Sequence, residues 1–237
     1  METGKTGKYF KYAIGEIVLV VIGILIALQI NNWNESRKQR VKEIDALENI
    51  KTSLLADLKL YNGVFKLRLG WKQKGLEYLK EVAYYKRIVP EDSIFSNYFD
   101  MGTDIVFRYD SGSYDALKSS GFDLIQNKEL RKKIINTYQI LLPAYMGFIN
   151  DKLERSETLE AQYKRDLFKD YVTKTKKNKL DVWVDFKVDN VLEHPSFLGL
   201  LRVEQGKYNN FISRIKTVTS FSETLIKEIE IELQLLK

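Results

Sequence analysis

The first long apolar run of the chain extends over residues 13–30 and is interrupted only by two glycines, one glutamate and one glutamine. At 1.5 Å per residue this run forms a helix of roughly 27 Å, close to the roughly 30 Å hydrocarbon core of a bilayer. Aromatic residues precede the run and Trp33 follows it, as is typical of membrane interfaces. The pattern predicts a transmembrane helix over residues 13–33.

The same run has two other interpretations, a cleaved signal peptide and a buried helix of a soluble protein. A signal peptide has an apolar core of about 7–15 residues, which is followed by a cleavage site with small residues. Here the bulky and polar stretch QINNWN (29–34) follows instead, which favours an uncleaved span.

Basic residues lie on both sides of the span. The tail 1–12 carries three lysines, and Arg37, Lys38, Arg40 and Lys42 follow the span, so that counting basic residues gives nearly a tie for the orientation. Because long domains cross a membrane largely regardless of their charge, we expect the tail in the cytoplasm and the remaining domain outside.

Small and polar residues of the span gather on one helical face. Projected at 100° per residue, this stripe holds Glu16, Val20, Gly23, Ala27, Asn31 and Asn34. The Gly23–Ala27 spacing lets two helix backbones approach closely. Glu16 has two interpretations, a carboxylate near the headgroups and a contact with a partner on this face. We expect a second copy or another membrane protein to pack against the stripe.

Beyond the span, apolar residues recur at three- and four-residue steps from Val41 to about residue 85, and no proline occurs before Pro90. The span is therefore expected to continue as a helical stalk. A bend is expected near Gly63, Gly70 and Gly75, because each glycine weakens a helix by about 1 kcal/mol relative to alanine.

The next part of the chain has shorter patterns. Pro90 is expected to begin a short helix, and residues 104–109 have the β-branched and aromatic content of a strand. Ser113 is expected to cap another short helix, which Gly121 ends in the left-handed conformation. Strict alternation over residues 181–189 predicts a second strand, expected to pair with 104–109.

Two more long amphipathic helices complete the pattern. Asn127 is expected to cap one that continues through a bend at Pro143, and the other extends from about Ser196 to Leu235. With the stalk they should form one antiparallel bundle with coiled-coil-like packing. The predicted fold class is mainly α, with two short β-strands. It comprises a basic tail (1–12), a transmembrane helix (13–33), and a helical stalk and bundle (34–237).

Two stretches carry a resemblance to a known family. The first is YAIGEIVLVVIGILIALQINNWNE (12–35), and the second is YDALKSSGFDLIQNKELRKKIINTY (114–138). They are similar to the two signatures of an uncharacterised family of single-pass membrane proteins, common in Bacteroidota and described as a domain of unknown function. The resemblance implies a membrane-anchored architecture and a bacterial origin. It brings no catalytic residue, because that family has no established activity.

The amino-acid composition excludes several kinds of functional site. The 237-residue chain is 44% hydrophobic and 30% charged, so that most of it should fold in water. It has no cysteine and a single histidine, His194, which excludes disulfides, thiolate chemistry and a multi-histidine metal site within one chain. The net charge of +6 comes from basic and acidic residues mixed along the sequence, so we expect no nucleic-acid partner.

Several motifs that suggest chemistry have a simpler interpretation. TGKTGK (3–8) lacks both the spacing of a phosphate loop and a strand before it. His194 has no nucleophile and acid around it, and KSSG (118–121) is typical of a helix end. The aspartates of two further stretches lack the spacing of a cation site; these are Asp100, Asp104, Asp110 and Asp115, and Asp181, Asp185 and Asp189. We expect no catalytic residue, metal or cofactor.

Four tyrosines near the irregular region are candidates for a groove that binds a peptide or a glycan: Tyr84, Tyr85, Tyr98 and Tyr109. The sequence is thus most consistent with a non-catalytic interaction or scaffold protein, tethered to a bacterial inner membrane by one span. The alternative is a ligand-sensing or accessory subunit of a membrane complex. A membrane-bound enzyme has the least support, because no catalytic constellation is visible.

Overall fold

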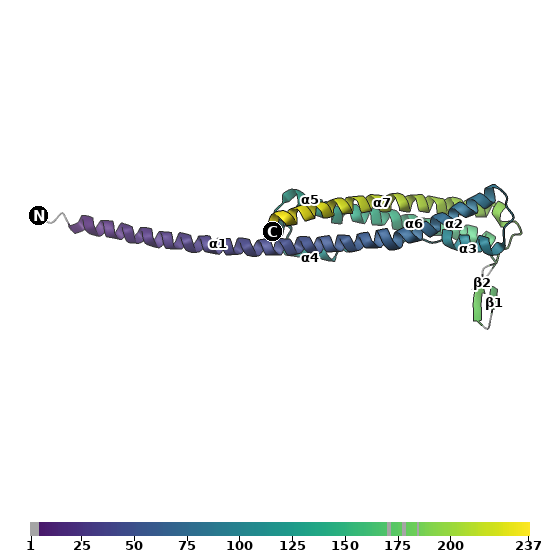
Figure 1. The fold of residues 1–237 in the computed structure, drawn as a ribbon, viewed down its shortest axis with the longest axis horizontal. Coiled ribbons are helices and arrows are strands. Elements are labelled where there is room, and N and C mark those ends of the chain that lie inside the picture. Colours follow the sequence, from purple (N-terminus) through teal and green to yellow (C-terminus); the bar gives the residue numbers. More distant parts are fainter. Residues whose placement is uncertain (1–4, 170–171, 177–178, 184) are drawn as a thin grey trace.

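Helix α1 (Lys5–Leu60) dominates the shape of the molecule, because its N-terminal half projects from a bundle that the rest of the chain forms (Figure 1). The computed structural model describes residues 5–169, 172–176, 179–183 and 185–237. The other helical elements are the π-turn η1 (Tyr61–Phe65), α2 (Lys66–Tyr84), α3 (Glu91–Met101), α4 (Gly112–Ser120), η2 (Phe122–Leu124), α5 (Lys128–Asn136), the π-turn η3 (Thr137–Leu141), α6 (Leu142–Leu167), η4 (Val191–Glu193) and α7 (Pro195–Leu236).

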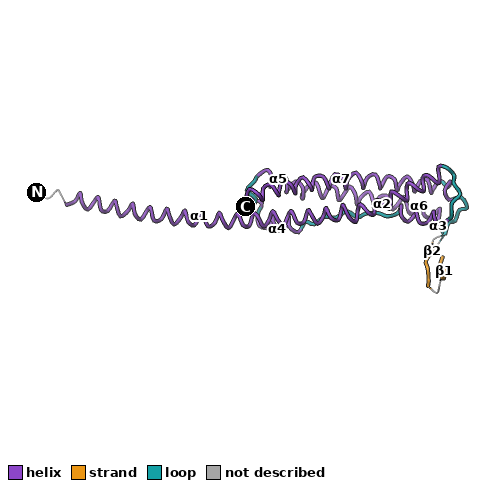
Figure 2. The backbone as a smooth tube through the Cα atoms, in the orientation of Figure 1, coloured by secondary structure: helices purple, strands orange, loops and turns teal. Residues whose placement is uncertain are grey.

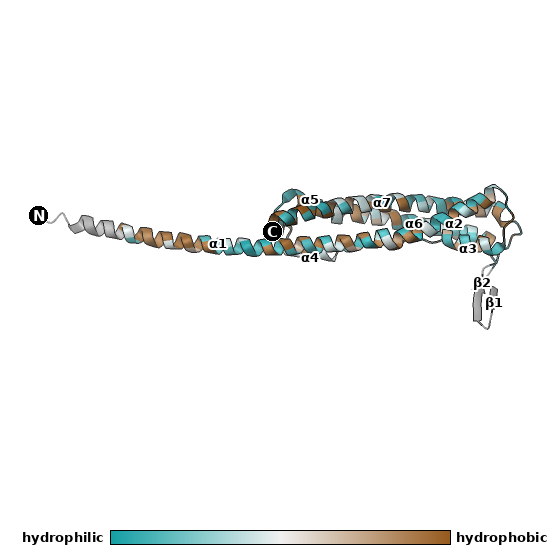
Figure 3. Ribbon diagram, in the orientation of Figure 1, coloured by the Kyte–Doolittle hydropathy of each residue, from teal (hydrophilic) through white to brown (hydrophobic). Residues whose placement is uncertain are grey.

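The apolar run of the sequence forms the projecting part of α1, coloured brown in Figure 3. It belongs to a helix long and apolar enough to cross a membrane, and none of the apolar window is buried within the chain. The run is therefore not a core helix of this bundle. Residues 5–12, expected as a tail, already belong to α1, and residues 1–4 lie outside the described part of the chain.

Three long helical columns form the bundle (Figure 2). The first consists of the second half of α1 with α2, the second of α5 with α6, and the third of α7, which packs against the other two. Helix α7 is antiparallel to both other columns. Near its C-terminal end, Lys237 Nζ lies 2.9 Å from Glu48 Oε1 on α1, and Glu228 pairs with Lys133 on α5. At its start, Ser196 Oγ donates to Asp166 near the end of α6 (2.7 Å). This arrangement confirms the predicted helical bundle.

The π-turns keep the apolar stripes in register. Buried residues of α1 recur at steps of three and four, and Tyr61, Phe65 and Leu69 continue this buried stripe across η1 at steps of four. The π-turn η1 accommodates these steps, because a π-turn holds one more residue than an α-turn. Of the glycines expected to bend the helix, only Gly63 lies in this irregularity.

Pro143 lies directly after the second π-turn, at the start of α6. Proline cannot donate to a carbonyl in the preceding turn, and its ring displaces that turn. The helical column nevertheless continues from α5 through η3 into α6, as expected.

Residues 104–109 do not form the expected strand, and this prediction is wrong. The segment is extended, but side chains from the helical columns take the place of a neighbouring strand. Phe107 N donates to Asn150 Oδ1 (3.0 Å), and Asn150 Nδ2 donates back to Phe107 O (3.2 Å). Tyr61 Oη donates to Arg108 O (3.1 Å), and Arg68 Nε to Asp104 O (2.7 Å). These four backbone groups are therefore satisfied without a sheet.

The expected pairing between 104–109 and 181–189 is also wrong. Strand β2 (Lys179–Trp183) instead pairs in an antiparallel hairpin with β1 (Val172–Lys176), shown in orange in Figure 2. The regular strand does not extend over the whole predicted range, because Phe186 makes only an isolated bridge to Phe168.

Capping and turn residues in the sequence correctly predicted most of these helix ends. Pro90 lies at the start of α3, and Asn127 Oδ1 accepts a hydrogen bond from Leu130 N at the start of α5 (3.1 Å). Gly121 ends α4 with a φ of +94°, although its ψ of 129° lies outside the helical left-handed region. The cap prediction for Ser113 is wrong: α4 begins at Gly112, and Ser113 Oγ lies 2.8 Å from Ser53 Oγ.

The core consists of two apolar clusters along the bundle axis. The proximal cluster, nearer the projecting part of α1, includes Leu54, Phe107 and Phe211. The distal cluster, nearer the hairpin, includes Leu76, Leu167 and Phe197. The position at which these clusters meet is where the candidate site lies.

Candidate functional site

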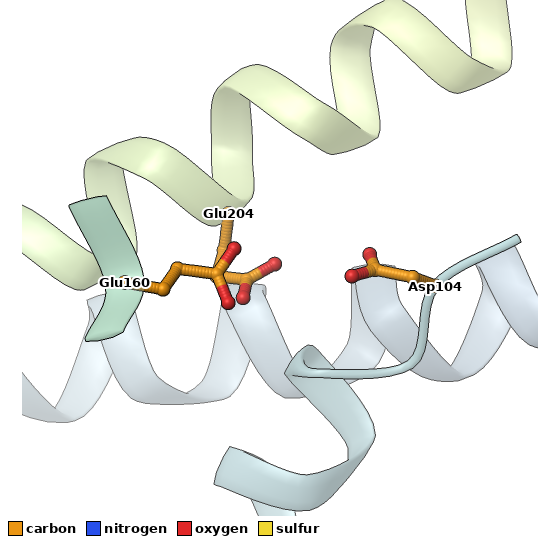
Figure 4. A group of neighbouring side chains, drawn as sticks. All are labelled: Asp104, Glu160 and Glu204. Carbon is orange, nitrogen blue, oxygen red and sulfur yellow. The ribbon is translucent and has the colours of Figure 1, made fainter. Parts of the chain in front are cut away.

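Charged side chains cross the bundle between the two apolar clusters, and we call this group the charge layer: Lys72, Asp104, Glu160, Glu204 and Lys207. Lys72 comes from α2, and both Glu204 and Lys207 come from α7. Glu160 comes from α6, and Asp104 follows α3; Figure 4 shows these two carboxylates with that of Glu204. Both lysines are fully buried, and the two glutamates are at most 4% exposed. Burial of this kind is rare for charged residues unless they are paired.

The ammonium of Lys72 has a complete set of acceptors. Its Nζ donates to Met101 O (2.6 Å), to Asp104 Oδ1 (2.8 Å) and to Glu204 Oε2. Three acceptors match the three donors of an ammonium. The ammonium is therefore fully satisfied although the side chain is buried.

Lys207 connects all three carboxylates. Its Nζ lies 2.6 Å from Asp104 Oδ2 and 3.1 Å from Glu204 Oε1, and it also forms an ion pair with Glu160 Oε1. The other oxygen of Glu160 accepts from Lys164 Nζ at 2.9 Å. With Lys164 included, three positive charges balance three negative charges in the layer.

The pKa values of Lys207 and Glu204 are shifted by burial and by the neighbouring charges. Burial alone would lower the pKa of Lys207, but the Glu204 and Asp104 carboxylates outweigh it and raise the pKa above the ordinary lysine value. Burial raises the pKa of Glu204, against the lowering effect of Lys72 and Lys207. Lys207 therefore stays charged at neutral pH, and the two neighbouring ammonium groups favour the ionised form of Glu204 against its burial.

The three carboxylates could also be considered as metal ligands, because each offers an oxygen within 4.8 Å of the others. Carboxylate oxygens are the ligands that hard divalent cations prefer. In this fold, however, Lys207 Nζ contacts all three carboxylates and Lys72 Nζ contacts two. A metal ion would have to displace buried ammonium groups, so the arrangement fits an internal ion-pair network better than a metal centre.

The charge layer was visible in the sequence only as an irregularity. Lys72 lies between Leu69 and Leu76, and Glu204 follows Leu201, at positions where the three- and four-residue steps require a buried residue. A charged residue at such a position was the available signal. It did not show which charged residues would meet, because the partners come from four segments of the chain.

A second polar group lies within the proximal half of the bundle. Both carboxylate oxygens of Asp57 accept from Asp110 N (3.1 and 3.2 Å), and Ser53 Oγ donates to Asp110 Oδ2 (2.8 Å). Burial raises the pKa of Asp57 to about 6, against the lowering effect of the Asp110 N–H, and the Asp110 carboxylate raises it further. These bonds fix the start of α4 on α1.

The stripe predicted for helix packing lies on the projecting part of α1. All six residues are exposed: Glu16, Val20, Gly23, Ala27, Asn31 and Asn34. A Cβ atom added at Gly23 would meet nothing within 4 Å. The stripe is thus uncovered within a single copy of the described chain.

The four tyrosines proposed as a groove belong to three separate places. Tyr84 and Tyr85 are exposed at the distal end of α2, with ring centroids 4.9 Å apart. Tyr98 packs on Phe168 against the distal cluster, whereas Tyr109 packs against the proximal cluster. The structure therefore does not bring the four residues into one surface.

Two other sequence candidates have structural positions. His194 Nδ1 accepts from Ser196 N (3.2 Å) and so caps α7. Asp185 forms an ion pair with Lys169 (3.2 Å). Neither contact brings together a nucleophile, a base and an acid.

A comparison with family models gives one match, to a family described as "Family of unknown function (DUF6090)", over residues 16–192. No curated protein and no solved structure matches the chain. The matched range includes both the apolar run of α1 and most of the bundle.

Proposed function

The chain belongs to the family DUF6090, whose function is unknown, and we propose that it is a membrane-anchored, non-catalytic interaction module. One observation carries this proposal: the apolar window of α1 is wholly exposed and continues without a break into a packed bundle. An exposed apolar helix of this length is costly in water and favourable in lipid. The anchor and the bundle are then one continuous rod.

The length of the rod supports a role in holding a binding surface away from the membrane. From Trp33, at the end of the apolar run, to Tyr84, at the end of α2, the helix rises roughly 75 Å at 1.5 Å per residue. The module would hold its distal end at that distance from the bilayer. A rod stiffened by three packed columns is suited to presenting a surface to a partner.

Membrane retention tests the anchor. The full-length protein is expected to stay in the membrane pellet after carbonate extraction, with its N-terminus intact. Ile22→Arg together with Leu25→Arg should release it, because each arginine near the centre of a span costs about 2.5–3.5 kcal/mol. Leu55→Arg, at an exposed position of the bundle, is the matched control. A freely soluble wild-type protein whose first residue lies past Trp33 would contradict the proposal.

Orientation and origin are parts of the proposal. We place the protein in a bacterial inner membrane, consistent with its resemblance to Bacteroidota proteins, with a single pass and the bundle outside the cytoplasm. Because the chain has no cysteine, Thr217→Cys on the exposed face of α7 gives a unique label. A membrane-impermeant maleimide should modify it in intact spheroplasts, and protection until lysis would reverse the orientation.

Association through the stripe is a further part of the proposal. Gly23 is open to solvent in the single chain, so a close-packed neighbouring helix would explain a glycine there. Gly23→Ile should weaken cross-linking in native membranes, whereas Leu25→Ile, on the same helix, should not. An unchanged pattern of cross-linked species would remove the stripe as an interface.

A ligand-sensing or accessory role is the second candidate, and a groove of about 930 Å³ between α1 and α4 favours it. Lys42, Asp45, Asn49 and Ser113 are among its lining residues. Ala116→Trp would fill the groove. If the groove binds a small molecule, extracts from the cells should slow hydrogen exchange in α4 of the wild type but not of this variant.

A further inference from the structure

We propose that the outward face of the column around η1 and α2 is a docking surface for an acidic amphipathic helix of a partner protein. This inference rests on the proposed function, because it names the class of partner that the membrane-anchored module would bind. We call this surface the Trp71 face and define it by Asn62, Gly63, Lys66, Leu67, Gly70 and Trp71, which line one shallow groove of about 350 Å³.

The Trp71 face exposes apolar side chains that the bundle does not use. Leu67 and Trp71 are 55% and 45% exposed. Leu67 and Trp71 are separated by four residues and so lie on one face of α2, opposite the buried Leu69 and Leu76. Tryptophan is strongly enriched among the residues that dominate protein interfaces.

No neighbour within the described chain packs closely against the glycines of this face. A Cβ atom added at Gly63 or at Gly70 would meet nothing within 4 Å. A glycine inside a helix weakens it, and Gly75 in the same helix shows the usual reason, because its Cβ would lie 2.5 Å from Met101 N on α3. At Gly63 and Gly70 the equivalent neighbour would be a partner that approaches the backbone closely.

Charge indicates which partner fits. The chain has no acidic residue between Asp57 and Glu77. Lys59, Lys66 and Lys74 are exposed there, and none of them has an ion pair within the part of the chain that the structure describes. A basic border around an apolar groove is complementary to a helix with apolar residues on one side and glutamates or aspartates beside them.

The same charges argue against two other occupants. Copies anchored in one bilayer would meet at equal height, so that Lys66 would face the Lys66 of the other copy. The face also lies roughly 45–55 Å along the rod from Trp33, well beyond the surface of the membrane that holds the anchor. An acidic protein helix therefore fits the observations better than a second copy or lipid.

The test uses full-length protein in nanodiscs, with Trp33→Phe and Trp183→Phe so that Trp71 is the sole tryptophan of the chain, excited at a wavelength that its tyrosines do not absorb. The probe is a synthetic amphipathic helix with leucines on one face and glutamates beside them. We expect a blue shift of Trp71 emission on binding. A peptide of identical composition with its leucines scattered around the helix should give no shift. Equal shifts with both peptides, or none with either, would overturn the proposal.

Two variants separate the contributions of charge and shape. Lys66→Glu with Lys74→Glu should weaken binding at least tenfold, whereas Lys38→Glu, outside the face, should not. Gly70→Ala should stabilise the free protein against urea and yet weaken binding at least fivefold, because its methyl group fills the groove. If Gly70→Ala bound as tightly as the wild type, the close-approach argument would be wrong.

The remaining outcomes identify other occupants. Sedimentation that shows a dimer lost in Trp71→Ser, or flotation with phosphatidylcholine–phosphatidylglycerol vesicles that is lost in Trp71→Ser, would replace the acidic helix by a second copy or by lipid. Carbonate extraction of the same variants separates this inference from the proposed function. Release of the wild type would refute the anchor, while peptide binding would still report on the Trp71 face.

Discussion

Lys72 on α2 and Glu204 on α7, 132 residues apart in the chain, form an ion pair whose side chains are 0% and 2% exposed. Removing two charges from water costs free energy that their attraction only offsets when all hydrogen bonds are satisfied. The full set of acceptors around Lys72 meets that condition. The charge layer therefore specifies how α2 and α7 align, because a shift of either helix would leave charges buried without partners.

Removal of one member of this pair should be much worse than removal of both. Lys72→Met leaves Glu204 buried beside one ammonium fewer, and we expect a loss of about 3–5 kcal/mol in the free energy of unfolding. Lys72→Met combined with Glu204→Leu keeps the layer balanced and should recover most of that loss. Urea unfolding in detergent measures both. Lys38→Met, which breaks the exposed pair with Glu35, is the control and should cost at most about 1 kcal/mol.

The Asp57 carboxyl should make the free energy of unfolding depend on pH. Its pKa is raised to about 6 in the folded state from 3.8. Between these values the folded chain binds a proton that the unfolded chain has released, so the free energy of unfolding falls as the pH rises through this window.

Asp57→Asn should flatten that pH dependence. It keeps an acceptor for Asp110 N and removes the buried charge, so we expect a gain on the order of 1 kcal/mol at pH 7. Thermal unfolding of both proteins from pH 4 to pH 8 measures the difference. A wild-type protein that becomes more stable than the variant as the pH rises would contradict the raised pKa.

Gly75 and Gly70 provide a matched pair of substitutions in α2. A Cβ atom at position 75 would overlap the Asn97 carbonyl oxygen and lie 2.5 Å from Met101 N, whereas at position 70 it meets nothing. Gly75→Ala should push α3 away and cost about 1–3 kcal/mol. Gly70→Ala should instead stabilise by up to about 1 kcal/mol. Equal effects in urea unfolding would show that α2 and α3 do not pack as closely as this.

Asn150 holds the extended segment in place of a strand. Asn150→Ala leaves both backbone groups of the buried Phe107 without a partner. We expect a loss of about 1–3 kcal/mol for each unsatisfied group, less any contribution from water. Hydrogen exchange at Phe107 N should accelerate at the same time. Asn49→Ala, which removes only an exposed bond to Asp45, is the control and should change neither measurement.

Much of the local structure follows from the sequence because it depends on neighbouring residues. The spacing of apolar residues predicted the helical columns, and the side chain of Asn127 predicted the start of α5. The apolar run of α1 was recognisable from length and composition alone. Each of these signals lies within a few turns of one helix, where geometry is determined by adjacent residues.

Other features depended on contacts between segments far apart in the chain. Residues 104–109 have the composition of a strand, yet Asn150 and Tyr61, more than 40 residues away, satisfy their backbone and make a strand partner unnecessary. Lys72, Glu160 and Lys207 are of residue types usually found at the surface, and packing of the three columns buries them together. By itself the sequence indicated where most helices form and which run of residues is long and apolar enough to cross a membrane. Only the tertiary structure decided which charges are buried, because burial depends on the partner that each helix face meets.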